Sequence, residues 1–178
     1  MPKSELNRTG LKKYLAQCSK KELEHDLNDL FTKFEVVRNY FQSKLNVTDN
    51  LRLLEKYKEI VNNEFFPRRG FGRARLAIAR KAITDYKKVC TSADQLADLM
   101  LFYVEAGVNF TNTYGDITTA FYSSLETMYA QAVQLIVKHG MRDLFQKRCA
   151  QIMQQTSGIG WGFHDAICEI YEDHFEEE

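Results

Sequence analysis

The chain has 178 residues, of which 44% are hydrophobic and 27% charged, and its formal net charge is zero. This composition excludes intrinsic disorder, and the length fits a single domain with a substantial core, which we take to be residues 1–178. The 9 glycines and 2 prolines are too few for a turn-rich all-β fold.

Apolar residues recur with the 3.6-residue period of amphipathic helices in the first third of the chain. A capping box at Ser19–Glu22 predicts the start of a second helix. Residues 46–50 are expected to form a loop in which Thr48 or Asp49 caps the next helix. The apolar stripes that mark the first four helices are Leu11–Cys18, Leu23–Phe34, Val36–Phe41 and Leu51–Phe65.

The segment Phe66–Gly72 breaks the helical pattern, because proline cannot extend a helix and glycine loosens it. The following helix is predicted from about Arg73 to Cys90, and a second capping box starts the next one at Ser92. Asp116 is expected to cap the long helix that Gly140 closes. The last two helices are predicted around Leu144–Met153 and Ala166–Tyr171.

Short loops between these segments make neighbouring helices antiparallel. We therefore predict an all-α fold of eight or nine antiparallel helices, arranged as a bundle or as a curved, HEAT-like stack of helix pairs. Most aromatic residues, including Phe31, Phe65 and Tyr129, fit the apolar stripes and are expected in the core. The four cysteines are widely spaced and are expected to be reduced core residues.

Charge is unevenly distributed along the sequence. Residues 52–90 carry a net charge of +7, whereas residues 91–140 carry −4 and residues 141–178 carry −5. On the helix predicted from about Arg73 to Cys90, cations would form a line at intervals of seven residues. Further cations would lie beside this line and in the loop before the helix. This basic stripe consists of Arg68, Arg69, Arg73, Arg80, Lys81, Lys87 and Lys88.

Several interpretations of the basic stripe remain open. It fits a solvated helix face, or one neutralised by the acidic segment Asp165–Glu178. It also fits a surface that binds an acidic protein or the phosphate backbone of a nucleic acid. The zero net charge weakens the nucleic-acid hypothesis, because dedicated nucleic-acid binders are usually basic overall.

Two short segments have polar side chains that core packing does not require. If they met in space, Asp116, His164 and Asp165 would form an acid–base group beside Tyr114 and Trp161. The structural alternative is that both aspartates stabilise helix N-termini and that Trp161 anchors a helix junction. We favour the structural alternative.

No catalytic or metal-binding signature occurs in the sequence. His164 and Cys168 lie one helical turn apart, but a metal site needs further ligands that the spacing does not supply. The nucleophile elbow, the phosphate loop and the dinucleotide fingerprint are all missing. We predict no metal, no cofactor and no catalytic residues.

The apolar runs are far shorter than the ~20 residues that span a bilayer, so we predict no membrane association. The first residues do not form a signal peptide, which favours a cytoplasmic location in which Asn46 and Asn109 are not glycosylated. A homo-oligomer is possible, but the residues do not indicate one.

Several motifs resemble those of a family of small bacterial proteins classed as a domain of unknown function. The motifs are Leu11–Leu15, Ser19–Leu23, Glu64–Pro67, Tyr114–Asp116 and Ile159–Asp165. The resemblance implies a bacterial, intracellular protein and supplies no activity, cofactor or catalytic residue.

The leading hypothesis is a non-enzymatic scaffold or adaptor that binds an anionic partner through the basic stripe. One alternative is a nucleic-acid-binding protein that uses the same stripe. A second alternative is an enzyme with a site at the segments around Asp116 and His164.

Overall fold

The computed structural model describes residues 7–45 and 47–176. These residues form nine α-helices and no strand, as the sequence predicted. The helices are α1 (Arg8–Gln17), α2 (Lys20–Lys33), α3 (Glu35–Leu45), α4 (Val47–Phe65), α5 (Leu76–Val89), α6 (Ala93–Tyr114), α7 (Thr119–Lys138), α8 (Arg142–Gln155) and α9 (Phe163–Phe175).

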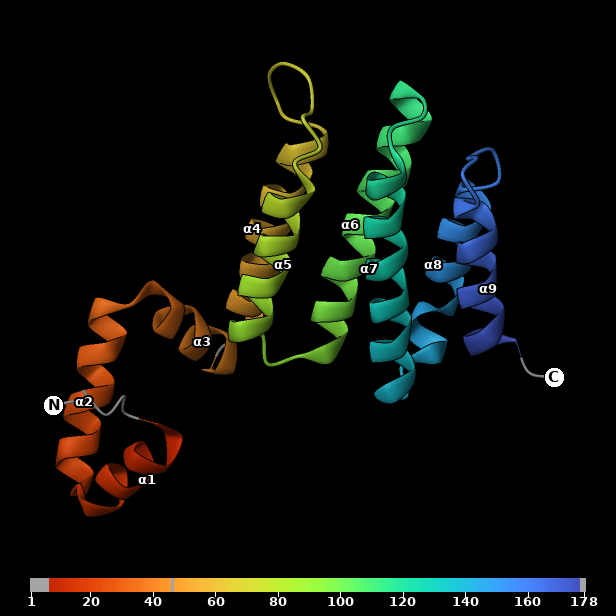
Figure 1. Ribbon diagram of the computed structural model, residues 1–178. Helices are drawn as coiled ribbons and strands as arrows, with labels where there is room; N and C mark the ends of the chain where they lie inside the picture. Colours follow the sequence, from red (N-terminus) through yellow and green to blue (C-terminus); the bar gives the residue numbers. More distant parts are fainter. Residues whose placement is uncertain (1–6, 46, 177–178) are drawn as a thin grey trace, which may run out of the picture.

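Helices α4 to α9 form a stack of three antiparallel pairs, α4/α5, α6/α7 and α8/α9 (Figure 1). The first helices of the pairs make one layer and the second helices make the other, with α4 against α6 and α7 against α9. The loops within the three pairs all lie at one end of the stack (Figure 1). Helices α1 and α2 project from the α4 end, and α3 connects them to the stack.

One apolar core runs between the two layers of the stack. Its largest fully buried side chains come from all six helices α4 to α9, and four of them are tyrosines (Tyr86, Tyr103, Tyr122 and Tyr129). Gly107 lets α6 approach α7 closely, because a Cβ there would lie 2.4 Å from Leu125 Cδ2. The stack is therefore held together by apolar packing between and within its pairs.

The helix predicted from Arg73 begins only at Leu76. The backbone N–H groups of Arg73 and Ala74 donate to the carbonyl oxygen of Glu64, and Arg75 forms an ion pair with the Glu64 carboxylate. These bonds tie the loop back to the end of α4, so Arg73 lies outside α5 and the predicted line of cations is shorter.

Three predicted helix starts need correction. The N-cap of α7 is Thr118, which accepts from Phe121 N, whereas Asp116 accepts a hydrogen bond from Tyr122 OH. Ser92 is the N-cap of α6, but its hydroxyl donates to Asp94 and makes no cap bond. The loop predicted at residues 46–50 is helical from Val47 on, and Asn46 lies outside the described residues. The capping box at Ser19–Glu22 is confirmed.

The N-terminal helices differ most from the predicted packing. Neither α1 nor α2 buries a residue, although each has an amphipathic sequence. Leu27, Leu30, Phe31 and Phe34, expected on a buried face, are exposed by 39–52%. The reason is positional: α1 and α2 lie beyond the end of the stack, where α3 covers only part of the apolar face of α2.

Candidate functional site

A groove runs between α5 and α7, with α6 beneath it. Helices α5 and α7 stay apart here, whereas α7 and α9 pack closely. The groove has a volume of about 660 Å³, and a second hollow of about 330 Å³ shares Lys87, Leu96, Met100 and Gln131 with it. We call the two hollows together the α5–α7 groove.

The floor and the rim of the α5–α7 groove differ in chemistry. The floor is apolar and consists of Ile83, Leu96, Met100 and Met128, all of which are buried. The rim is polar, with hydroxyl and amide side chains contributed by Thr84, Ser123, Thr127, Gln131 and Gln134. A polar rim around an apolar floor is typical of surfaces that receive an amphipathic segment of another protein.

Three cations complete the lining, Arg80 and Lys87 from α5 and Lys138 from the end of α7. Within the described part of the chain, no carboxylate lines either hollow. The electrostatic potential in the groove is therefore positive and favours an anionic ligand.

Arg80 is held at the side of the groove by a buried hydrogen-bond relay. Its guanidinium donates to Ser124 Oγ at 2.8 Å, and Ser124 Oγ lies 2.8 Å from the hydroxyl of Tyr103. A tyrosine phenol keeps its proton at neutral pH, and burial raises the pKa of Tyr103 further, so this hydrogen bond persists. The relay fixes one end of Arg80 before any ligand binds, which lowers the entropic cost of binding.

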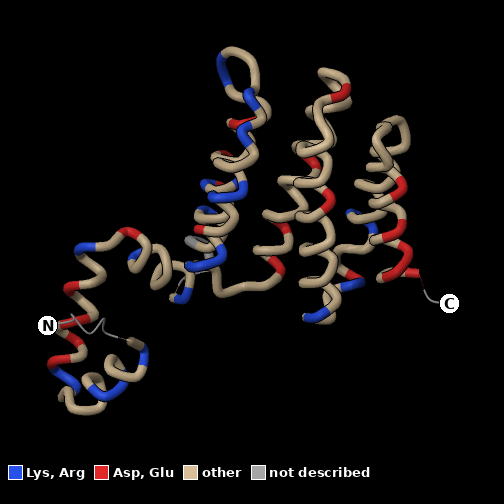
Figure 2. The backbone as a smooth tube through the Cα atoms, viewed as in Figure 1, with Lys and Arg blue, Asp and Glu red and all other residues tan. Residues whose placement is uncertain are grey.

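The other cations of the basic stripe lie outside the groove. Lys81 and Lys88 both pair with Asp85, which neutralises part of their charge. Arg68 pairs with Glu59 at 2.9 Å. Arg69 and Arg73 lie in the loop before α5. Figure 2 shows the resulting concentration of basic residues on α4, α5 and their connecting loop.

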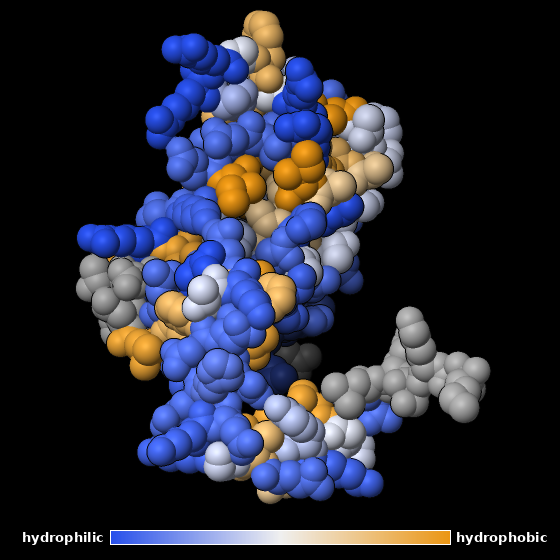
Figure 3. All heavy atoms as spheres, turned by 90° about the vertical axis from the view of Figure 1, so that its left-hand side faces the viewer, coloured by the Kyte–Doolittle hydropathy of each residue, from blue (hydrophilic) through white to orange (hydrophobic). Residues whose placement is uncertain are grey.

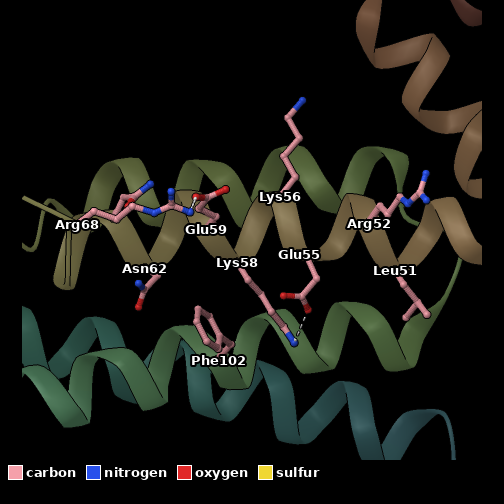
Figure 4. Close-up of a pocket in the computed structure, with 10 residues that line it drawn as sticks. Leu51, Arg52, Glu55, Lys56, Lys58, Glu59, Asn62, Arg68 and Phe102 are labelled. Carbon is pink, nitrogen blue, oxygen red and sulfur yellow. Dashed lines mark hydrogen bonds and ion pairs between the residues drawn. The ribbon is translucent and has the colours of Figure 1, made fainter.

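A larger hollow of about 730 Å³ lies on the opposite layer, between α4 and α6 (Figure 4). Cations and carboxylates alternate along it, and they pair with each other or with neighbouring acids. Lys58, for example, bridges Glu55 at 3.4 Å and Asp98 at 2.8 Å. This hollow offers less net charge to a ligand than the α5–α7 groove, although its volume is larger.

The two predicted polar segments lie at the loop end of the stack. Asp116 Oδ1 accepts from Tyr122 OH at 3.1 Å, and the same phenol accepts from Ile117 N and contacts Thr111. The Tyr122 ring packs against Phe163, which begins α9, with a centroid distance of 5.2 Å. Tyr122 thus connects the Asp116 loop to the helix that contains His164 and Asp165.

His164 has its own partners. Its Nδ1 lies 2.8 Å from the hydroxyl of Thr156, and Cys168 Sγ lies 3.6 Å from Nε2. Because the Thr156 hydroxyl donates to Met153 O, the hydrogen of the contact with His164 belongs to Nδ1. Among the described residues, no hydrogen bond links His164 or Asp165 to Asp116.

Cys168 is a weak nucleophile at neutral pH. Burial raises the pKa of its thiol, and the nearby carboxylates of Glu172 and Asp165 raise it further, so the thiolate is scarce. The described residues contain no group of three or more His, Cys, Asp or Glu side chains that could hold a metal ion.

Trp161 and Tyr114 do not enclose these polar groups. Trp161 is exposed by 61% and has a positive φ of 64°, and Tyr114 is exposed by 50%. The structural prediction that Trp161 anchors a helix junction is therefore wrong, because an anchoring side chain would be buried.

Sequence reasoning missed part of the groove. Lys138 is the only cation in residues 91–140, and Ser124 is a polar residue at a buried position of an otherwise apolar stripe. Both were visible as exceptions in the sequence, but their proximity to Arg80 and Lys87 depends on the spacing of α5 and α7.

Comparison with known proteins identifies the family. A family model described as a family of unknown function, DUF6155, matches residues 6–176. The chain belongs to the DUF6155 family. A search of curated proteins and a search of solved structures found no match for this DUF6155 chain. No helix in its described residues is both long and apolar enough to cross a membrane.

Proposed function

We propose that this DUF6155 protein is a non-enzymatic interaction module that binds an acidic, amphipathic segment of a partner protein in the α5–α7 groove. The observation that carries the proposal is the groove lining, which combines three cations with an apolar floor and has no described carboxylate. We also propose that the protein is bacterial and is located in the cytoplasm, as expected from the sequence.

The shape of the groove favours a protein segment over a nucleic acid. A duplex presents phosphates over a broad surface, and its recognition rests on many exposed cations. Here Lys81 and Lys88 share Asp85, and Arg68 is paired with Glu59. The buried Met100 and Met128 supply an adaptable apolar contact for the leucine or aromatic side chains of a helix.

The test is fluorescence anisotropy with a labelled model peptide in which glutamates surround leucines at helical spacing. We expect salt-sensitive binding, because exposed charge pairs are screened by salt. The groove variant combines Arg80→Glu, Lys87→Glu and Lys138→Glu and should abolish binding. Its matched control combines Arg69→Glu, Lys81→Glu and Lys88→Glu, which changes net charge equally outside the groove and should leave binding intact.

Short single-stranded and duplex DNA, titrated under the same conditions, separate the two classes of partner. DNA binding that both variants weaken equally would replace our proposal with a nucleic-acid function. Absence of peptide binding at low salt, or equal loss in the two variants, would refute the groove as the site. Thermal unfolding of each variant checks that the fold is retained.

A further inference from the structure

The N-terminal helices have apolar faces that the rest of the described chain covers only in part. More than half of the exposed large apolar side chains in the described residues lie within residues 11–40. They are exposed by 38–56% and comprise Leu11, Tyr14, Leu15, Leu27, Leu30, Phe31, Phe34, Val36 and Tyr40. In Figure 3, apolar atoms emerge between polar ones at the bottom of the molecule, where α1 and α2 lie.

Local interactions are too weak to account for these helices by themselves. Helices α1 and α2 have 10 and 14 residues and bury none. Isolated helices of that length are marginal in water, and helices in proteins gain most of their stability from tertiary packing. The hydrogen bond from Tyr14 OH to Asp26 and the α2 capping box hold the hairpin together, but both are exposed.

The charges of the two helices favour a second copy as the cover of their apolar faces. Helix α1 carries three cations, Arg8, Lys12 and Lys13, and no acid. The central part of α2, residues 22–29, carries four acids and no cation, and the pairs that Glu24 and Asp29 form with Lys20 and Lys33 are exposed and therefore weak. A two-fold axis that places α1 of each copy against α2 of the other would make both contacts between copies attractive at once.

The exposed area is also large enough. Nine side chains, seven from α1 and from α2 with its C-cap and two from the start of α3, would contribute ~900 Å² per copy at ~100 Å² each, whereas a stable interface needs ~800 Å² per partner. A partner of different sequence would need its own matching arrangement of charges, whereas a second copy already has it.

We infer that the protein forms a two-fold homodimer through the apolar faces of α1, α2 and the start of α3, with α1 of each copy against α2 of the other. The interface lies beyond the α4 end of the stack (Figure 1). The α5–α7 groove stays open, because none of its lining residues belongs to α1 or α2. The dimer is therefore independent of the proposed function.

The first test is the mass of the full-length protein in solution, measured by sedimentation equilibrium and light scattering. The wild type should have twice the 20.7 kDa of one chain. The double variant Leu27→Glu/Phe31→Glu should be monomeric, with the dissociation constant raised by at least ~tenfold. Leu144→Glu is the control, because Leu144 is exposed by 65% on α8 and should leave the dimer intact.

The second test exchanges charges between the two helices. Lys12→Glu/Lys13→Glu and Glu24→Lys/Asp29→Lys should each weaken self-association, because each variant places like charges together in both contacts. A mixture of the two should form a heterodimer, since opposite charges then face each other in both contacts. Circular dichroism of each variant alone checks that α1 and α2 remain helical.

The results separate this inference from the proposed function. A monomeric wild type, a Leu27→Glu/Phe31→Glu variant that still dimerises, or a mixture that does not associate would overturn the dimer. The groove variant with Arg80→Glu, Lys87→Glu and Lys138→Glu should remain dimeric, so its loss of peptide binding reports on the groove alone.

Discussion

The charge network around Arg148 gives the sharpest prediction about stability. Arg148, on α8, donates to both oxygens of Glu105 at 2.6 and 2.7 Å and to Asp98 Oδ1 at 2.6 Å. The other carboxylate oxygen of Asp98 accepts from Lys58 of α4, which reaches toward α6 in Figure 4. The network therefore joins α4, α6 and α8 within one layer of the stack.

The burial of these side chains determines how much the network contributes to the stability of the fold. The side chains of Arg148, Asp98 and Glu105 are each exposed by only about a quarter. Burial opposes the charged form of Arg148, but its hydrogen bonds to Glu105 and Asp98 outweigh that effect and raise its pKa. Exposed pairs contribute at most ~1 kcal/mol, whereas removing one partner of a fully buried pair costs ~3–5 kcal/mol. For this partly buried network we therefore expect the removal of Arg148 to lower the free energy of unfolding by an amount between these two limits, about 2–3 kcal/mol.

The perturbation is Arg148→Met, which keeps an unbranched apolar stem and removes the charged guanidinium. Urea unfolding should show a loss of about 2–3 kcal/mol in the free energy of unfolding, because Asp98 and Glu105 then repel each other in a poorly hydrated position. Adding Asp98→Asn and Glu105→Gln should restore at least half of the loss. Lys81→Met, which removes an exposed ion pair on α5, should change stability little. An Arg148→Met protein as stable as wild type, or a triple variant less stable than the single one, would refute the reasoning.

Two further predictions concern single positions. Gly72→Ala should cost about 1–3 kcal/mol, because its Cβ would lie 1.7 Å from the backbone oxygen of Phe65. Gly158→Ala, whose Cβ would meet open space, should stay within about 0.5 kcal/mol of wild type in the same urea titration. Burial raises the pKa of Glu126 in the folded protein, so the negative charge of Glu126 destabilises the fold. This destabilisation is absent at a pH below the pKa of Glu126 in the unfolded state, and it is complete at a pH above the pKa in the folded state. Glu126→Gln should therefore increase the free energy of unfolding at about pH 7 and have no effect at about pH 3, and a destabilised variant at pH 7 would contradict this sign.

Helix periodicity predicted much of the fold because it depends only on local spacing. Phe65 and Tyr129 were expected in the core from their apolar stripes, and both are buried. The start of α5 could not be predicted in this way. It depends on Glu64, which accepts backbone hydrogen bonds from residues nine and ten positions further along the chain. No local pattern encodes that contact.

The α5–α7 groove illustrates a second limit of sequence reasoning. The basic stripe was identified from Arg80, Lys87 and their neighbours, but the sequence does not tell which cations share a surface. Asp85, one turn from Lys81 and Lys88, pairs with both of them. Lys138, 51 positions from Lys87, lines the same groove. Sites made by the spacing of helices require the packing, which periodicity does not supply.

The N-terminal helices show a third limit, and it bears on both proposals. Periodicity reveals that a helix has an apolar face, but it does not reveal whether that face meets the same chain or another one. Here the stack of α4 to α9 completes its core without α1 and α2. If two copies meet through those helices, one particle carries two open α5–α7 grooves. A partner with two acidic segments would then gain effective concentration at the second groove. The projection of α1 and α2 from the stack would thus be a means of pairing two grooves in one particle.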